Sequence, residues 1–124
     1  MSNENVSIYE PGANISGRAK TDVIGKRFLA IVGDRDGGNI SVGHATAAGR
    51  ACGVSKYDAA AGEIVGVARG NSRVTYVTAA GAIAAFAEVE VGADGKASTL
   101  AAGEPVGYAV TAATDGGDAE ISLY

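Results

Sequence analysis

The chain has 124 residues, enough for one domain and too few for two ordinary hydrophobic cores. Alanine accounts for 25 of the hydrophobic residues, and Val, Ile, Leu and Phe together make up only about a fifth of the chain. The core is therefore small, and we expect assembly with other chains to add stability. Residues 1–73 carry nine Lys/Arg against seven Asp/Glu and residues 74–124 carry one against seven, and neither part has the basic, aromatic-rich face of a direct nucleic-acid binder.

The first 27 residues differ in composition from the rest. They are polar and hold few large apolar side chains, and residues 9–12 (Tyr-Glu-Pro-Gly) place Pro and Gly as a type II turn requires. We therefore expect residues 1–27 to form an extended N-terminal arm that is mobile when free. Residues 28–124 are expected to form a compact β domain.

Strand signals begin after this arm. Residues 28–32 are a continuous apolar run, residues 33–38 hold turn residues at almost every position, and residues 39–43 alternate as a return strand. Residues 64–68 and 73–78 are rich in β-branched residues and predict two further strands.

The second half of the chain continues the pattern. Residues 79–87 are ambiguous, because their alanines favour a helix while Gly81 opposes one. Residues 87–91 alternate, with the valines predicted to face inward and the glutamates outward, and residues 92–95 then turn the chain into a hairpin partner at 96–100.

A repeated segment adds to this picture. Residues 60–68 and 101–109 both place an Ala-Ala-Gly turn before a short apolar strand, and a last strand is expected at residues 119–124. The fold predicted is all-β, a small sandwich or barrel of short strands with at most one short helix. The predicted core residues are Phe28, Ile31, Val65, Val67, Val89, Val91, Val106, Val110, Ile121 and Leu123.

The sequence predicts no catalytic, cofactor or metal site. Residues 34–38 look like the start of a calcium loop, but the glycine and glutamate that such a loop needs are replaced by Asn39 and Ala45. His44 has no second His or Cys at ligand spacing. Cys52 is expected to be a small buried side chain, and Glu88 and Glu90 to lie on a solvated strand face.

No apolar run reaches the roughly 20 residues of a membrane span, and the polar start lacks the regions of a signal peptide. We therefore expect no membrane contact and synthesis in a cytoplasm.

An ordered series of motifs along most of the chain resembles the capsid decoration, or cement, proteins of tailed bacteriophages. The motifs lie at residues 9–12, 25–31, 61–68, 81–97 and 107–109, and in the strand that ends at Tyr124. The resemblance implies a non-enzymatic virion protein on the outer surface of the expanded capsid, usually as a homotrimer made by the β domain. It also implies that the arm reaches the major capsid protein.

The arm is therefore the candidate capsid-binding site, through backbone hydrogen bonds to a strand edge and apolar anchors at Ile8, Tyr9 and Ile15. The candidate contact residues are Ile8, Tyr9, Glu10, Pro11, Gly12, Ile15 and Arg18. The alternative is a sugar- or host-surface-binding β module, which exposed aromatic residues gathered on one face would favour. An enzyme ranks third and would need a deep pocket lined by polar groups.

Overall fold

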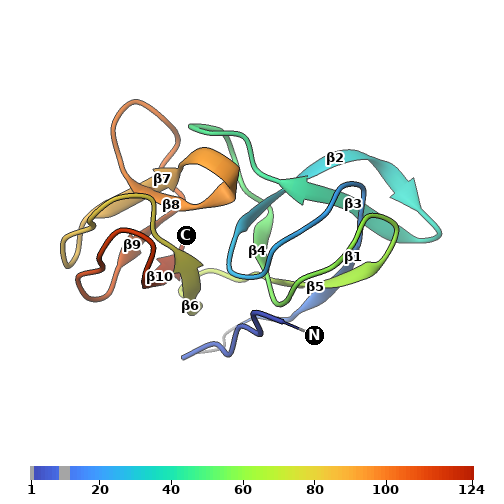
Figure 1. Ribbon diagram of the computed structural model, residues 1–124, viewed down its shortest axis with the longest axis horizontal. Coiled ribbons are helices and arrows are strands. Elements are labelled where there is room, and N and C mark those ends of the chain that lie inside the picture. The colour runs from blue at the N-terminus through green and yellow to red at the C-terminus, as the bar shows by residue number, and fades with distance from the viewer. Residues whose placement is uncertain (1, 9–11) are drawn as a thin grey trace.

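Two β layers, a closed barrel and an open sheet, make up the computed structural model, which describes residues 2–8 and 12–124 (Figure 1). The strand order is β1-β3-β2-β4-β5 in the barrel and β6-β10-β9-β7-β8 in the sheet. Within the described residues there is one 3-10 turn, η1 (Ala93–Gly95), and no α-helix. The all-β prediction is confirmed, with a barrel and a sheet packed together rather than one of them alone.

The barrel is built from the first half of the chain. Its strands are β1 (Ile15–Ala19), β2 (Phe28–Asp36), β3 (Asn39–His44), β4 (Gly53–Ser55) and β5 (Ile64–Ala68). β1 runs parallel to β3 and antiparallel to β5, and the remaining pairs are antiparallel. The loop expected at residues 33–38 is mostly strand: β2 continues to Asp36, and the turn is Gly37-Gly38, both at positive φ as a tight hairpin requires.

The sheet is built from the second half and is antiparallel throughout. Its strands are β6 (Val74–Thr78), β7 (Glu88–Val91), β8 (Ala97–Thr99), β9 (Gly107–Ala109) and β10 (Asp118–Leu123). Val89 and Val91 are buried, so the inward phase and the β7–β8 hairpin predicted from the sequence are confirmed. The ambiguous residues 79–87 form no helix.

A bridge-turn-strand unit occurs four times. In the barrel half, Val23 and Ala59 exchange a pair of backbone hydrogen bonds that joins two loops. In the sheet half, Ile83 and Ala113 do the same, and we call these four the bridge residues. Five residues after each bridge residue a strand begins, β2, β5, β7 and β10 in turn. Three residues after each bridge residue the backbone has a positive φ, at Lys26, Gly62, Phe86 and Gly116. The repeat at residues 60–68 belongs to this series; that at 101–109 does not.

Two apolar clusters fill the molecule. One lies inside the barrel and contains Ala19, Val23, Leu29, Val42, Ala59, Val65 and Val67. The other lies between the barrel and the sheet, where Phe28, Val54 and Ala68 pack with Val77, Val89, Val91, Ile121 and Leu123. β2 supplies both clusters, with Leu29 in the first and Phe28 in the second. The two layers therefore form one folding unit.

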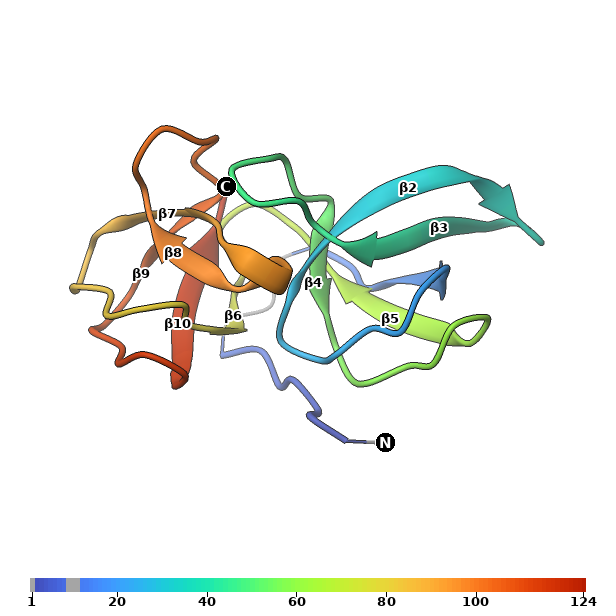
Figure 2. The same ribbon diagram turned by 45° about the horizontal axis from the view of Figure 1, so that its top comes forward.

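Two predicted core residues are wrong. Ile31 is 58% exposed because β2 continues past β4, which pairs only with Phe28 and Leu29, into a ribbon that no other layer covers (Figure 2). Val110 is exposed because β9 presents Gly107 and Ala109 to the core instead. A side chain at residue 107 would meet the Ser122 carbonyl oxygen at 2.5 Å, so only glycine fits there. Val106 is half-buried at the edge of this core, and the other seven predicted residues are buried.

The N-terminal boundary also differs from the expectation. β1 lies within residues 1–27, pairs with two barrel strands, and contributes the fully buried Ala19. Val23 is buried in the same cluster. The sequence Ile-Ser-Gly-Arg-Ala contains a single large aliphatic residue, so hydrophobic pattern alone could not identify this strand. β1 and Val23 therefore pack with the barrel, although they lie in the range expected to form the arm.

A pair of matched substitutions tests the core assignment. Val89→Ala removes buried methyl groups and is expected to lower the free energy of unfolding by about 2 kcal/mol. Val110→Ala makes the same change at an exposed site and is expected to alter it by less than about 0.5 kcal/mol. Urea denaturation measures both values, and equal losses would contradict the assigned faces of β7 and β9.

Candidate functional site

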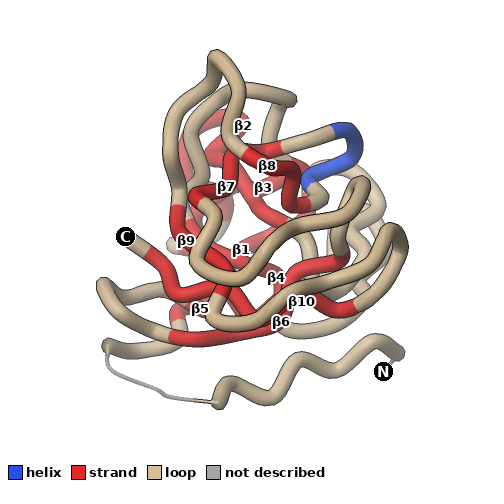
Figure 3. The backbone as a smooth tube through the Cα atoms, turned by 90° about the vertical axis from the view of Figure 1, so that its left-hand side faces the viewer, coloured by secondary structure: helices blue, strands red, loops and turns tan. Residues whose placement is uncertain are grey.

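The N-terminal residues 2–8 lie along the outside of β6, as the tube in Figure 3 shows. Three backbone hydrogen bonds hold them: the Asn5 N–H donates to the Lys56 carbonyl at 2.7 Å, the Ile8 N–H to the Val74 carbonyl at 2.8 Å, and the Ser2 carbonyl accepts from the Asp58 N–H at 2.9 Å. The segment thus contacts both the barrel half and β6. It also covers the edge of the sheet, which is otherwise open to another strand.

The side chain of Asn5 completes this attachment. It is 2% exposed, its Nδ2 donates to the Tyr76 carbonyl at 2.7 Å, and its Oδ1 accepts from the Thr75 hydroxyl at 2.9 Å and from the Tyr76 N–H at 3.1 Å. An asparagine amide thereby occupies the place that a neighbouring strand would take on β6. Each of these buried polar atoms has a partner, so the burial of Asn5 adds stability.

Ser7 makes a second buried polar contact. Its hydroxyl accepts a hydrogen bond from Arg73 Nε at 3.0 Å and lies 3.4 Å from the Thr75 hydroxyl. Arg73 is 2% exposed, and its Nη1 also donates to the Arg69 carbonyl at 3.3 Å. A buried guanidinium requires such partners, which ties Ser7 to the fold.

The N-terminal segment alternates in the opposite sense to a normal surface strand. The polar Asn5 and Ser7 face inward, whereas the apolar Val6 and Ile8 face outward and are 71% and 38% exposed. Alternation with period two is what an extended chain produces. Here the apolar side chains of the segment face solvent and its polar side chains face the body.

The other predicted site residues divide into three groups. Tyr9, Glu10 and Pro11 lie outside the described residues. Gly12 is described and has φ +87°, and a Cβ there would lie 2.8 Å from the Arg69 carbonyl oxygen, so the position requires glycine.

The third group, Ile15 and Arg18, lies in β1. Ile15 stands opposite Val67 and packs at the edge of the barrel core. Arg18 donates through Nη1 to the Gly62 carbonyl at 2.7 Å and lies 3.9 Å from the Asp36 carboxylate. Both side chains thus contact the body of the protein itself.

A cluster of aromatic side chains was not foreseen from the sequence. Phe86 and Tyr108 meet edge to face at a centroid distance of 5.3 Å, and Tyr124 lies 6.1 Å from Tyr108. The Tyr124 hydroxyl donates to Glu88 Oε2 at 2.6 Å, and this bond raises the pKa of the tyrosine. Phe86, Tyr108 and Tyr124 are separated in the sequence. The one sequence signal for the cluster is that Tyr108, between two residues that face the core, must point outward from β9.

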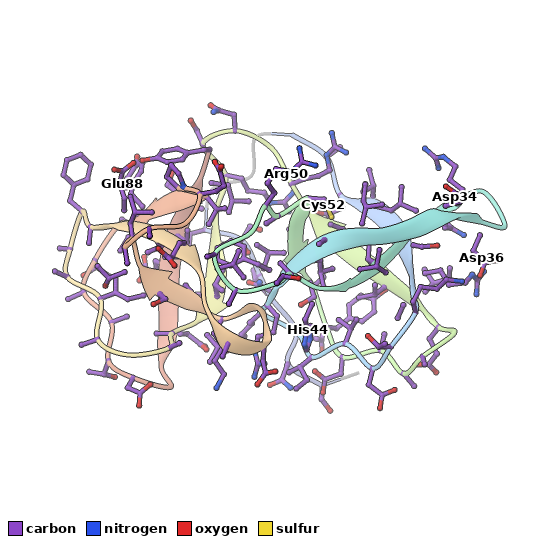
Figure 4. The ribbon with its side chains drawn as sticks, turned by 90° about the horizontal axis from the view of Figure 1, so that it is seen from above. Asp34, Asp36, His44, Arg50, Cys52 and Glu88 are labelled. Carbon is purple, nitrogen blue, oxygen red and sulfur yellow. The ribbon has the colours of Figure 1, made fainter. Side chains whose placement is uncertain are left out.

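A hollow of about 270 Å³ lies where the barrel meets the sheet. Its polar lining includes Arg50, Arg69, Glu104 and Cys52, and the residues described there include no histidine that could act as a base toward the cysteine. Burial raises the pKa of the Cys52 thiol, which is therefore protonated at neutral pH and a poor nucleophile. In Figure 4, Arg50 and Cys52 lie together, and His44 lies on the other side of the body.

Two further carboxylates, Glu90 and Asp36, have structural partners. Glu90 accepts hydrogen bonds from the backbone N–H groups of Ala101 and Gly103, which lower its pKa. Asp36 pairs with Lys20 at 3.2 Å. Residues 2–8 and 12–124 contain no group of three or more His, Cys, Asp or Glu side chains placed to share a metal ion. No helix within these ranges is long and apolar enough to span a membrane.

Known proteins share both the sequence pattern and the fold. The family model described as "Phage cement protein" matches residues 18–123. The head fiber gp8.5 N base of bacteriophage phi29 has a TM-score of 0.77 and 24% sequence identity to this chain, over 90% of this chain and 93% of that one. At that identity the likeness shows a common fold. No curated protein matches the chain.

The attachment of the N-terminal segment leads to a stability prediction. Asn5→Ala leaves the Tyr76 backbone groups and the Thr75 hydroxyl without their partner, and is expected to lower the free energy of unfolding by about 1–3 kcal/mol. Glu4→Ala, at the exposed neighbouring position, serves as the control and should change it little. Thermal and urea denaturation measure both, and an unchanged Asn5→Ala protein would mean that the segment is not bound to the body in solution.

His44 leads to a pH prediction. Its Nε2 accepts the Ile24 N–H at 3.0 Å, and burial is the main cause that lowers its pKa. The pKa of a histidine in the unfolded chain is about 6.5. Below that pH the unfolded chain binds more protons than the folded one. The stabilising contribution of neutral His44 is therefore present above that pH and is lost as the pH falls through the folded-state pKa. Between pH 7.5 and 5, wild type should therefore lose more stability than His44→Gln. Parallel pH profiles of the two proteins would refute this.

Proposed function

The chain belongs to the phage cement protein family, whose members are structural proteins of the virion and not enzymes, and from this premise we propose how it acts. It binds the outer surface of the capsid, as trimers, and cements adjacent capsomers after the head has expanded. Its partner in this role is the major capsid protein. A protein of the same fold is the head fiber base of phage phi29, which supports the head as the place of attachment.

The reversed alternation of the N-terminal segment is the observation that carries this proposal. Asn5 and Ser7 hold the segment to the body through buried hydrogen bonds, while Val6 and Ile8 are left facing outward. A monomer gains nothing from exposing these two side chains. Burial against a partner would remove their apolar area from water, at roughly 25 cal/mol per Å².

The capsid contact therefore centres on residues 6–12. Val6 and Ile8 act as apolar anchors, and Tyr9, Glu10, Pro11 and Gly12 continue the same contact. Ile15 and Arg18, which contact the barrel, hold the base of this segment in place. Because residues 5–8 already alternate as an extended chain does, they require little further ordering when they add to a capsid strand.

A sugar-binding module is less well supported. The aromatic cluster does gather on one part of the surface, as that alternative requires. Its rings, however, are inclined to one another by 83° and 48°. They do not form the flat platform on which a sugar ring could stack, so attachment to a protein lattice is the function that the geometry supports best.

Co-sedimentation with undecorated, expanded heads tests the proposal. The double variant Val6→Ser/Ile8→Ser is expected to bind the heads at least about tenfold more weakly than wild type, because two apolar anchors are lost. Its melting temperature should be unchanged, since both side chains are exposed. Glu4→Ala is the matched control and should bind normally. If the double variant occupied the heads as fully as wild type, the capsid contact would lie elsewhere on the body.

A further inference from the structure

The outer face of the sheet, on the side away from the shared core, carries a group of aromatic and aliphatic side chains. Tyr108 on β9 stands at its centre, and the strand register pairs it with Glu88 on β7 and with Ser122 on β10. Side chains two residues along from these three share their face, because side chains alternate along a strand. The members of this outer patch are Phe86, Tyr108, Val110 and Tyr124.

Phe86 bears two costs in this patch. It has φ +66° at the third position of the turn 84–87, where the equivalent turns before β5 and β10 have Gly62 and Gly116. A bulky residue in this region is a conformational outlier. The contact with Tyr108 holds the ring in place but leaves the side chain 78% exposed. Strain that the fold itself does not require indicates a functional role.

The same face of the sheet already binds a lysine. Lys26, which comes from the barrel half, places Nζ 6.0 Å from the centroid of the Tyr76 ring and 2.8 Å from the Asp118 carboxylate. Tyr76 on β6 and Asp118 on β10 both belong to the outward phase of their strands. A ring and a carboxylate side by side thus hold a cation, through the face of the ring and an ion pair.

The outer patch has the same two components without the cation. Glu88 accepts the Tyr124 hydroxyl at 2.6 Å, and Glu120 is a neighbour of Val110, whose N–H donates to the Glu120 carbonyl at 2.8 Å. Within residues 2–8 and 12–124 neither carboxylate has an ion pair. Residues 74–124 carry one Lys/Arg against seven Asp/Glu, so the sheet half is acidic. A partner that complements this face is therefore positively charged.

We propose that the outer patch docks a segment of the major capsid protein that carries an arginine or a lysine between apolar residues. The cation lies over the exposed rings and pairs with Glu88, and Glu120 adds to the negative charge around it. The apolar neighbours of the cation cover Phe86 and Val110. Arginine suits this site best, because its planar guanidinium stacks on an aromatic ring and also bonds a carboxylate.

This inference rests on the proposed function, to which it adds a second contact with the same partner. The N-terminal segment lies along β6, the free edge of the same sheet. One sheet therefore carries both contacts, an apolar one at its edge and an aromatic, acidic one on its outer face.

Charge variants test the role of the carboxylates. Glu88→Gln/Glu120→Gln removes both charges and keeps an acceptor for the Tyr124 hydroxyl. At low salt it is expected to bind undecorated, expanded heads about tenfold more weakly than wild type, and its binding should depend less on salt. Glu4→Gln/Asp34→Asn removes two exposed charges elsewhere, and Asp34 lies at the opposite end of the molecule from Glu88 (Figure 4). This control should bind normally. Normal binding by Glu88→Gln/Glu120→Gln would overturn the inference.

Phe86→Gly separates binding from stability. Glycine adopts a positive φ without strain, so the melting temperature should be unchanged or higher. Binding to heads should nevertheless fall about tenfold or more, because the exposed ring is lost. Ile24→Ala, at an exposed apolar position of the barrel half, is the control and should bind normally. A folded Phe86→Gly protein that occupies heads as fully as wild type would contradict the proposal.

Photo-cross-linking identifies the occupant of the patch. With p-benzoylphenylalanine at position 86, illumination of decorated heads should join this chain to a segment of the major capsid protein that contains an arginine or a lysine, as read by mass spectrometry. No product, a product with a second copy of this chain, or a capsid segment without a basic residue would each overturn the inference. If wild type does not bind heads, the proposed function fails. If Val6→Ser/Ile8→Ser weakens binding and the patch variants do not, only this inference is wrong.

Discussion

The packing of the barrel against the sheet is the constraint on which the rest of the structure depends. The chain has few large apolar residues, and neither half could bury enough area alone. Phe28, Val54 and Ala68 on the outer side of the barrel meet the inner face of the sheet and make one shared core. Close approach of the two layers depends on small residues: a Cβ at Gly95, between β7 and β8 of the sheet, would lie 2.6 Å from the Phe28 carbonyl oxygen of the barrel. Because this shared core is small, several aliphatic and aromatic side chains lie outside it.

Polar and apolar groups divide their roles at the N-terminus. Buried hydrogen bonds from Asn5 and Ser7 attach the first residues to the body, so the fold does not use Val6 and Ile8 for its own stability. Those two side chains are therefore available to a partner. The attachment also covers the edge of β6 and so opposes unwanted strand pairing.

The four bridge-turn-strand units give the two halves a common local design with different surfaces. Glycine fills the left-handed position of two units, and Lys26 and Phe86 fill it in the others. Lys26 pairs with Asp118 at 2.8 Å and so joins the barrel half to the sheet half. Phe86 points outward instead. The same backbone turn thus serves internal cohesion at one site and exposure of an aromatic ring at another.

The sequence by itself determined the strands with strong local signals, such as the alternation from Glu88 to Val91 and the hairpin after it, and its ordered motifs indicated the family. Only the tertiary structure decided which faces are covered. It placed the weakly patterned β1 in the barrel, turned Gly107 and Ala109 rather than Val110 to the core, and left Ile31 on an uncovered ribbon. It also brought Phe86, Tyr108 and Tyr124 together. The physical reason is that alternation specifies two faces of a strand, whereas burial depends on which distant segment packs against each face.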